Sequence, residues 1–176
     1  TLSNHHLMTL PPLLVAALEM KAFGAEYAKQ VVANARSLAA ALHKAGLDAQ
    51  CPDRGYTETH QVAVDVSKLG GGGQAAEALE KNDIIVNRNQ LPWDPPKKLS
   101  NPSGIRLGAQ EMTRVGMRAA EMEEIARLMK AIIADKKDVK AEVNKLRSRF
   151  QTVQYSFDAP RSDAKPGPIE VDMAGY

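Results

Sequence analysis

The chain has 176 residues, of which 44% are hydrophobic and 25% are charged, with a formal net charge of +2 at neutral pH. This length and composition predict a soluble globular protein with one sizeable core plus extensions. Because lysine and arginine are spread among aspartate and glutamate, no concentrated basic face points to nucleic acid or to an anionic membrane as a partner.

The first predicted element is a long helix that begins near Pro11-Pro12 and ends at Ala45-Gly46. Proline costs little in the first turn of a helix, and glycine commonly follows the last turn. Most of one face is apolar: Leu14, Leu18, Phe23, Tyr27, Val31, Leu38 and Leu42. Such a helix spans about 50 Å, more than a small domain needs. We therefore expect part of it to contact another domain or subunit.

The middle of the chain predicts a small sheet. Residues 61–66 place three valines at alternate positions, as in a half-buried strand. A flexible glycine-rich surface connection, Gly70–Gly73, is expected to lead into a short helix over about residues 74–80. Two short apolar strands, Ile84–Val86 and Ile105–Leu107, are expected to complete the sheet.

Two more helices are predicted towards the end of the chain. Met122, Ile125, Met129 and Ile132 recur at helical spacing within residues 121–134, and a more charged helix follows over residues 138–150. We expect the helices to cover one face of the sheet, which makes the fold α/β in the broad sense (α+β). From Gln151 the composition changes to proline, aspartate, serine and glycine, so the tail to Tyr176 is predicted to be an extended arm or disordered.

An arginine inside one predicted strand is the main chemical clue. Arg106 lies between Ile105 and Leu107, where an apolar residue would be expected, and the strand is entered through Ser103-Gly104. Its guanidinium offers a planar fork of donors, which suits bidentate binding of a carboxylate. A structural ion pair is the alternative, because buried arginine is usually paired with an acid. The residues alone leave both interpretations open.

The loop before this strand offers the rest of a pocket, with Asn87, Arg88, Asn89, Gln90 and Trp93. An asparagine side chain offers both a hydrogen-bond donor and an acceptor. Asparagine is also an ordinary turn residue in a proline-rich loop.

Three short stretches of this region resemble a known family. The sequences VNRN at 86–89, PWDP at 92–95 and SGIRLG at 103–108 are similar, in order and spacing, to the carboxyl-terminal domain of serine hydroxymethyltransferase. That family consists of pyridoxal-phosphate enzymes of the aspartate-aminotransferase fold type. EYAKQVVANA at 26–35 resembles the helix between the family's two domains, and the similarity runs roughly from Ser3 to Ala134.

The resemblance implies a division of the chain and a set of site residues. Residues 1–46 would form the interdomain helix region, residues 47–150 the small domain with a mostly antiparallel sheet, and residues 151–176 the tail. Arg106, with Ser103 and Gly104 beside it, would bind the α-carboxylate of the amino-acid substrate. Asn89 would contact the folate.

The family transfers a hydroxymethyl unit between serine and glycine, with pyridoxal phosphate as cofactor and tetrahydrofolate as cosubstrate. Its Schiff-base lysine follows a histidine, but the only His-Lys pair here, His43-Lys44, lies in the predicted long helix. The aspartate that pairs with the cofactor nitrogen has no match. We therefore expect a large pyridoxal-phosphate domain upstream or on a separate chain, no catalytic residue in this chain, and no activity from it alone. The family also implies a homodimer or tetramer.

Two other interpretations stay open. A related enzyme would keep Arg106 but use another aldol partner, as in a folate-independent aldolase or transaldolase or an α-methylserine hydroxymethyltransferase. A non-catalytic binding or assembly module would keep the fold and lack the active site. The presence of a lysine-bearing domain separates the second of these from the enzymes, and folate dependence separates the first.

The remaining features predict no further site. His5-His6 lacks additional ligands at metal spacing, so no metal site is expected. The only cysteine, Cys51, excludes an intrachain disulfide framework and suits a reducing compartment. We find neither a long apolar run nor a basic leader sequence, so we expect no membrane span and a cytoplasmic location.

Overall fold

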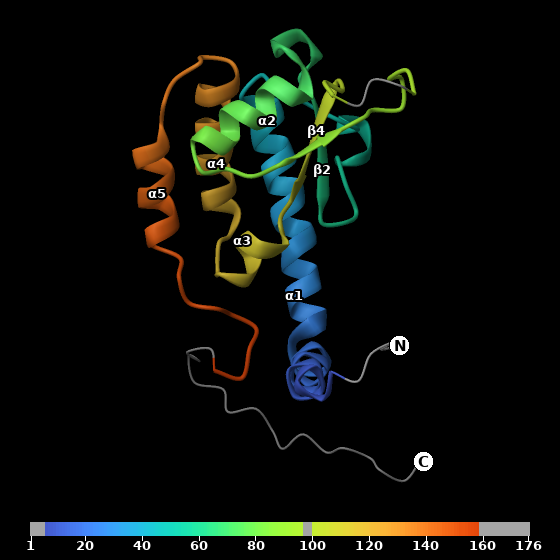
Figure 1. The fold of residues 1–176 in the computed structure, drawn as a ribbon, viewed down its shortest axis with the longest axis vertical. Helices are drawn as coiled ribbons and strands as arrows, with labels where there is room; N and C mark the ends of the chain where they lie inside the picture. The colour runs from blue at the N-terminus through green and yellow to red at the C-terminus, as the bar shows by residue number, and fades with distance from the viewer. Residues whose placement is uncertain (1–5, 97–99, 159–176) are drawn as a thin grey trace.

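The computed structural model describes residues 6–96 and 100–158 (Figure 1). The strands are β1 (Asp48–Ala49), β2 (Gln61–Asp65), β3 (Asn87–Asn89) and β4 (Gly104–Gly108). The α-helices are α1 (Leu10–Lys44), α2 (Gly71–Lys81), α3 (Gln110–Arg114), α4 (Ala119–Ile133) and α5 (Lys140–Ser148), and short 3-10 helices occur at η1 (Leu7–Thr9), η2 (Pro52–Arg54) and η3 (Ser67–Leu69).

The four strands form one antiparallel sheet in the order β1-β2-β4-β3. Val62 and Val64 of β2 are buried together with Ile105 and Leu107 of β4, whereas Arg106 is exposed. Because side chains alternate between the two faces of a sheet, one face packs on the helices and Arg106 projects from the other. The predicted fold, a small antiparallel sheet covered by helices on one face, is confirmed.

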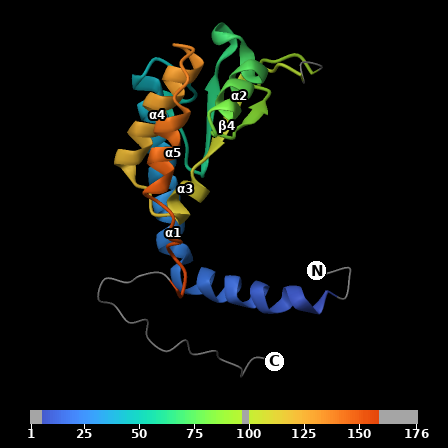
Figure 2. The same ribbon diagram turned by 60° about the vertical axis from the view of Figure 1, so that its left-hand side comes forward.

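The second half of α1 forms the centre of the core with α4, and Figure 2 shows the two helices lying together with α5. Asn34 of α1 is fully buried. Its amide nitrogen donates to the Thr113 hydroxyl and to the Met117 carbonyl, both at 2.9 Å, and its oxygen accepts from Gln30 at 2.8 Å. A buried amide with its partners satisfied holds α1 in one position against α3 and the segment that follows it.

The first half of α1 extends away from this core (Figure 2). Large apolar side chains are exposed along η1 and this half: Leu7, Met8, Leu10, Leu13, Leu14, Val15 and Met20. By length and composition the helical run Leu7–Lys44, whose most apolar window has a mean hydropathy of 1.3 and is not buried, would suffice to cross a membrane. The prediction that the chain has no long apolar run is therefore wrong. The same test is passed by the core helix of a soluble protein and by a signal sequence.

Residues 151–158 fold back onto the middle of α1. The Glu19 carboxylate accepts from the Arg114 guanidinium at 2.8 Å and from the Phe157 amide at 3.1 Å. Arg114 also donates to the Tyr155 carbonyl at 2.9 Å. These charge-assisted bonds, between partly buried groups, tie α1, α3 and the segment after α5 together. The first part of the predicted tail is thus packed, and residues 159–176 lie outside the described residues.

Two ring contacts accompany these bonds. The centroids of Phe23 and Phe157 are 5.6 Å apart, and those of Tyr27 and Tyr155 are 5.3 Å apart. The Tyr27 hydroxyl donates to the Gln110 carbonyl at 3.1 Å, and burial raises the pKa of Tyr27. The aromatic pairs extend the contact between the helix and the returning segment over two helical turns.

The glycine run is a correction to the sequence prediction. We expected Gly70–Gly73 to be a flexible surface connection, but α2 begins at Gly71, and residues 71–73 are buried. The Gly72 amide donates to the Pro102 carbonyl at 2.7 Å, and a Cβ at Gly72 would collide with the carbonyl of Gly104. Gly71 has a φ of 84°, which side-chain-bearing residues rarely adopt. The glycines therefore form the surface on which the entrance to β4 packs.

The strand predicted at Ile84–Val86 is a second correction, because the observed strand is β3 at Asn87–Asn89. Ile84 and Val86 are partly buried against the core, whereas Ile85 is 87% exposed. Packing on the core, rather than sheet pairing, accounts for the apolar residues. The other predicted helices and strands are confirmed near their expected ends, and β1 and α3 were not predicted because they are too short to show a periodic pattern.

A pair of glycine substitutions tests the packing at α2. Gly72→Ala is expected to lower the free energy of unfolding by about 1 to 3 kcal/mol, because the added methyl group meets backbone that must shift. Gly24→Ala in α1 is the matched control, since its methyl group would meet Met20 only at ordinary contact distances of 3.7 Å and 3.8 Å. That change should raise stability by about 0.5 to 1 kcal/mol. Urea unfolding of the 176-residue chain measures both, and equal stabilisation would contradict the packing argument.

Candidate functional site

The face of the sheet opposite the helices presents the candidate site. The pairing register places Arg106 of β4 directly between Ala63 of β2 and Asn87 of β3. Residues that are directly opposite in antiparallel strands project from the same face. The guanidinium therefore has a small methyl group on one side and a carboxamide on the other. The sequence placed Asn87 among the loop residues near Arg106, and the register of β3 shows that it lies directly opposite Arg106.

Arg106 is exposed, and it makes no hydrogen bond or ion pair with the residues that the structure describes. Asp65 lies on the same face, but its carboxylate accepts from the Ser67 amide at 2.7 Å. The structural ion pair considered as an alternative for Arg106 is thus not formed within the described chain. An arginine held in the middle strands of a sheet, with its fork of donors open, can bind a carboxylate through two parallel bonds.

Gly104 makes room for the loop next to Arg106. It is buried, and a Cβ at this position would lie 2.8 Å from Leu91 and 3.0 Å from the Asn89 carbonyl oxygen. Leu91 is itself only 5% exposed. Because residues 104 and 106 project from the same face of β4, Leu91 covers the sheet beside Arg106. Gly104, predicted to contribute to the substrate site, is thus placed where the loop approaches the strand closely.

Ser103 lies at the end of the loop between β3 and β4, directly before β4. It is 4% exposed, and its hydroxyl donates to the Asp94 carboxylate at 2.5 Å. The Ser103 amide donates to the same carboxylate at 2.8 Å, and the Leu91 amide does so at 3.0 Å. The structure therefore brings Ser103 close to Arg106 in the chain but turns its hydroxyl towards Asp94. Its predicted contact with substrate stays a prediction.

Asn89 lies on the edge strand, directly opposite Gly104, and is half-buried. Its side-chain nitrogen donates to the Gln90 carbonyl at 2.7 Å. Asn87 and Asn89 share a face, so two carboxamides line the edge of the sheet next to Arg106. The structure thus places Arg106, Gly104, Asn87 and Asn89 on one face of the sheet, and it adds Leu91 and Asp94 as neighbours that the sequence did not indicate. The substrate and folate contacts assigned to Arg106, Gly104 and Asn89 stay predictions.

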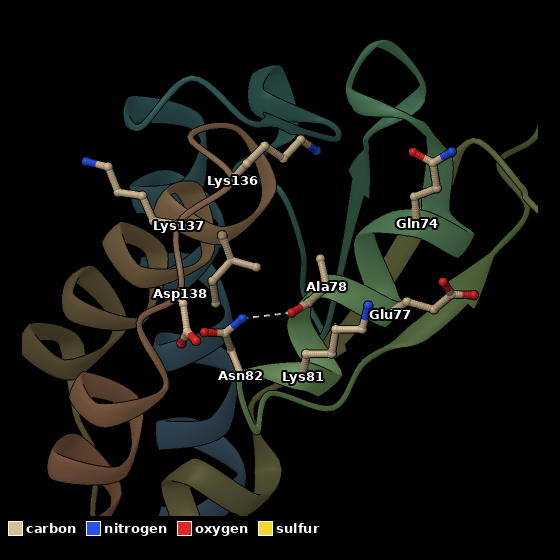
Figure 3. Close-up of a pocket in the computed structure, with 9 residues that line it drawn as sticks. Gln74, Glu77, Ala78, Lys81, Asn82, Lys136, Lys137 and Asp138 are labelled. Carbon is tan, nitrogen blue, oxygen red and sulfur yellow. Dashed lines mark hydrogen bonds between the residues drawn. The ribbon is translucent and has the colours of Figure 1, made fainter.

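A shallow hollow of about 330 Å³ lies elsewhere, between α2, the end of α4 and the segment between α4 and α5 (Figure 3). Its charged side chains do not converge, since Lys136 and Lys137 point to different sides in Figure 3. The Asn82 side chain, which lines the hollow, donates to the Ala78 carbonyl and accepts from the Val139 amide. The hollow therefore offers no built site. Within residues 6–96 and 100–158, no three His, Cys, Asp or Glu residues are grouped as metal ligands would be, and His5 lies outside these ranges.

The fold and the site together define a class of protein: a small helix-covered domain with an open arginine-bearing sheet face and a protruding apolar helix. Over 89% of its length the chain superposes, with a TM-score of 0.77 and 35% sequence identity, on the crystal structure of L-threonine transaldolase from Pseudomonas fluorescens in its internal aldimine state. The chain therefore has the fold of this part of a fold type I pyridoxal-phosphate enzyme.

The family model of serine hydroxymethyltransferase matches residues 4–129. The chain is 51% identical over 172 residues to a serine hydroxymethyltransferase of Metallosphaera sedula and 54% identical over 159 residues to one of Archaeoglobus fulgidus. These alignments cover 95% and 89% of this chain. The chain belongs to the serine hydroxymethyltransferase family.

The chain spans 40% of the length of the Metallosphaera relative, 36% of the Archaeoglobus relative and 36% of the transaldolase chain. It corresponds to a part of these proteins. The resemblance stated from the sequence motifs is confirmed by these comparisons.

Proposed function

We propose that this chain is the carboxyl-terminal part of a serine hydroxymethyltransferase that transfers a one-carbon unit from serine to tetrahydrofolate. The observation that carries the proposal is Arg106, which is exposed on the uncovered face of the sheet, within the residues that the family model matches. The role of the chain is to bind and orient the substrate carboxylate. Asn89, at the adjacent edge, contacts the folate.

The sheet gives Arg106 the rigidity that orientation requires. β4 is paired with β2 over five residue pairs and with β3 over three, and Arg106 is opposite a partner on both sides. A carboxylate bound by a fixed planar fork has both its position and its rotation set, so the bond to be broken is held in one orientation. Orientation of this kind contributes to the rate without any proton transfer by Arg106.

Pyridoxal phosphate, when bound, supplies the electron sink for this chemistry. The described residues do not fit its attachment, because the only histidine-lysine pair, His43-Lys44, is exposed in the last turn of α1. We therefore assign the cofactor to a large domain, upstream or on a separate chain. By itself the chain is inactive in this proposal.

The partners follow from the surfaces that the chain leaves open. The sheet face around Arg106 faces the large domain, and the apolar first half of α1 packs on protein rather than crossing a membrane. Its exposed apolar side chains support this, because an extended apolar surface marks an interface. The complete protein is a cytoplasmic homodimer or tetramer in this proposal.

A second function is favoured by one specific finding, the 35% identity to an L-threonine transaldolase. An enzyme of that kind would keep Arg106 and have no use for a folate contact at Asn89. The roughly 50% identities to proteins named serine hydroxymethyltransferase favour the first function. Folate dependence of serine cleavage by the complete protein separates the two.

The decisive experiment is borohydride reduction of the native protein from its source, followed by intact mass measurement of every chain that carries or co-purifies with this sequence. We expect a longer or paired polypeptide with a phosphopyridoxyl group on a lysine, because the described residues offer no such lysine. A lone, unmodified 19.1 kDa chain would instead identify a non-catalytic module.

Arg106→Ala tests the substrate contact in the complete enzyme. We expect the binding free energy of serine and glycine to weaken by about 2 to 4 kcal/mol, because a charged bidentate bond is lost. The pyridoxal-phosphate content of the enzyme should stay unchanged. Arg88→Ala is the matched control, since Arg88 is opposite Ile105 and so lies on the other face of the sheet. Spectroscopic titration with glycine measures the affinity, and an unchanged value would refute the assignment.

Asn89→Ala tests the folate contact separately. We expect the KM for tetrahydrofolate to rise about tenfold, the size of one lost hydrogen bond, while folate-free aldol cleavage is largely retained. Steady-state kinetics of both reactions provide the measurement. An equal loss of both activities would show that Asn89 has a structural role.

A further inference from the structure

We propose that Asp94 is a positioning residue for the folate contact: its carboxylate closes the neck of the loop between β3 and β4 and thereby fixes Asn89. This inference rests on the proposed function for its ligand and on hydrogen bonds for its geometry. Asp94 accepts from the Leu91 amide at 3.0 Å, the Ser103 amide at 2.8 Å and the Ser103 hydroxyl at 2.5 Å. Leu91 and Ser103 lie at the two ends of the loop, which we call its arms, and the point where Asp94 bonds to both is the neck. One side chain thus joins the two arms.

The arm that contains Ser103 is anchored to the domain. The Pro102 carbonyl accepts from the Gly72 amide at 2.7 Å. The Asn101 side chain accepts from the Gly73 amide at 2.8 Å and donates to the Gly70 carbonyl at 3.0 Å. Two consecutive residues are thus bonded to the buried start of α2, and this arm cannot move without breaking several hydrogen bonds.

The arm that contains Leu91 has fewer attachments. It leads back to β3, an edge strand of three residues that pairs only with β4. Leu91 is held by its packing over Gly104, by the bond from its amide to the Asp94 carboxylate, and by a turn bond of 2.9 Å from the Asp94 amide to its carbonyl. The Arg88 guanidinium of β3 adds a longer bond of 3.4 Å to the Ser100 carbonyl of the other arm. Asn89 lies two residues before Leu91. The Asp94 carboxylate therefore connects Leu91 and the end of β3 to Ser103, whose arm of the loop is bonded to the start of α2.

Arg106 does not depend on this connection. β4 pairs with β2 over five residue pairs on the side away from the loop, from Gln61 opposite Gly108 to Asp65 opposite Gly104. Loss of Asp94 should therefore loosen the folate contact and leave the carboxylate contact in place. A general loss of stability would affect both contacts, so the two readouts distinguish positioning from a merely structural role.

The chemistry of the neck predicts which substitution is tolerated. Asparagine keeps one oxygen, which can accept from the two backbone amides that now share an oxygen, and its NH₂ group can donate to the Ser103 hydroxyl. Asp94→Asn should therefore preserve the closed neck, whereas Asp94→Ala removes every acceptor. Ser103→Ala removes only the hydroxyl bond and should give an intermediate effect. Asp53→Ala is the matched control, because Asp53 is an exposed aspartate beside a proline in η2.

The first experiment measures amide hydrogen exchange at Leu91 and Ser103 by NMR in the 176-residue chain. We expect exchange at both amides to accelerate at least tenfold in Asp94→Ala and to stay within threefold of the unchanged chain in Asp94→Asn and Asp53→Ala. Unchanged exchange in Asp94→Ala would overturn the proposed closure of the neck. This outcome does not depend on what the complete protein catalyses.

The second experiment measures kinetics of the same variants in the complete holoenzyme. We expect Asp94→Ala to raise the KM for tetrahydrofolate about tenfold, with folate-free aldol cleavage retained within threefold, and Asp94→Asn to restore the unchanged value. An equal loss in both reactions would overturn the positioning role. If the unchanged enzyme shows no folate dependence, the proposed function and the folate part of this inference fail together, and hydrogen exchange still decides whether Asp94 closes the neck.

Discussion

The alternation of side chains along β4 is the constraint on which the rest of the site depends. Ile105 and Leu107 are buried in the core, so the residue between them must project from the opposite face. Pairing with β2 on one side and β3 on the other then fixes the direction of Arg106. A shift of one residue in this register would bury the guanidinium and expose the two apolar side chains. The apolar core therefore sets the position of the charged group without contacting it.

The same constraint explains why glycines gather around the strand. The start of α2 contacts the entrance of β4 through backbone atoms, and the loop contacts Gly104 through Leu91. A side chain at either place would separate the layers. Glycine in a helix costs conformational entropy. Here, because glycine has no side chain, the backbones of a helix and a loop can approach the strand closely. The residues before β4 are thus bonded to α2 on one side, and Leu91 of the loop covers Gly104 on the other.

Features that rest on local signals could be predicted from the sequence, and features that rest on pairing between distant segments could not. The limits of α1 follow from Pro11-Pro12 and Gly46, and β4 follows from its apolar residues and the arginine between them. The roles of Gly72 and Asp94 depend on partners about 30 and nine residues away, which no spacing rule connects. Asn87 could be placed in the loop near Arg106, but its position directly opposite Arg106 depends on the register of β3. The strand predicted at Ile84–Val86 was wrong because core contact and sheet pairing give the same apolar pattern over three residues.

The two proposed contacts of the site are held by different parts of the fold. Arg106 lies on a strand paired on both sides, whereas Asn89 lies on an edge strand whose adjoining loop is fastened through Asp94. Binding of the amino-acid carboxylate and binding of the folate can therefore change independently, because changes in the loop can alter the folate contact while the strand that carries Arg106 stays in place. Every enzyme that binds an amino acid through this strand needs the first contact, but only one that uses folate needs the second. Family members with different aldol partners should therefore differ mainly between β3 and β4 rather than at the arginine.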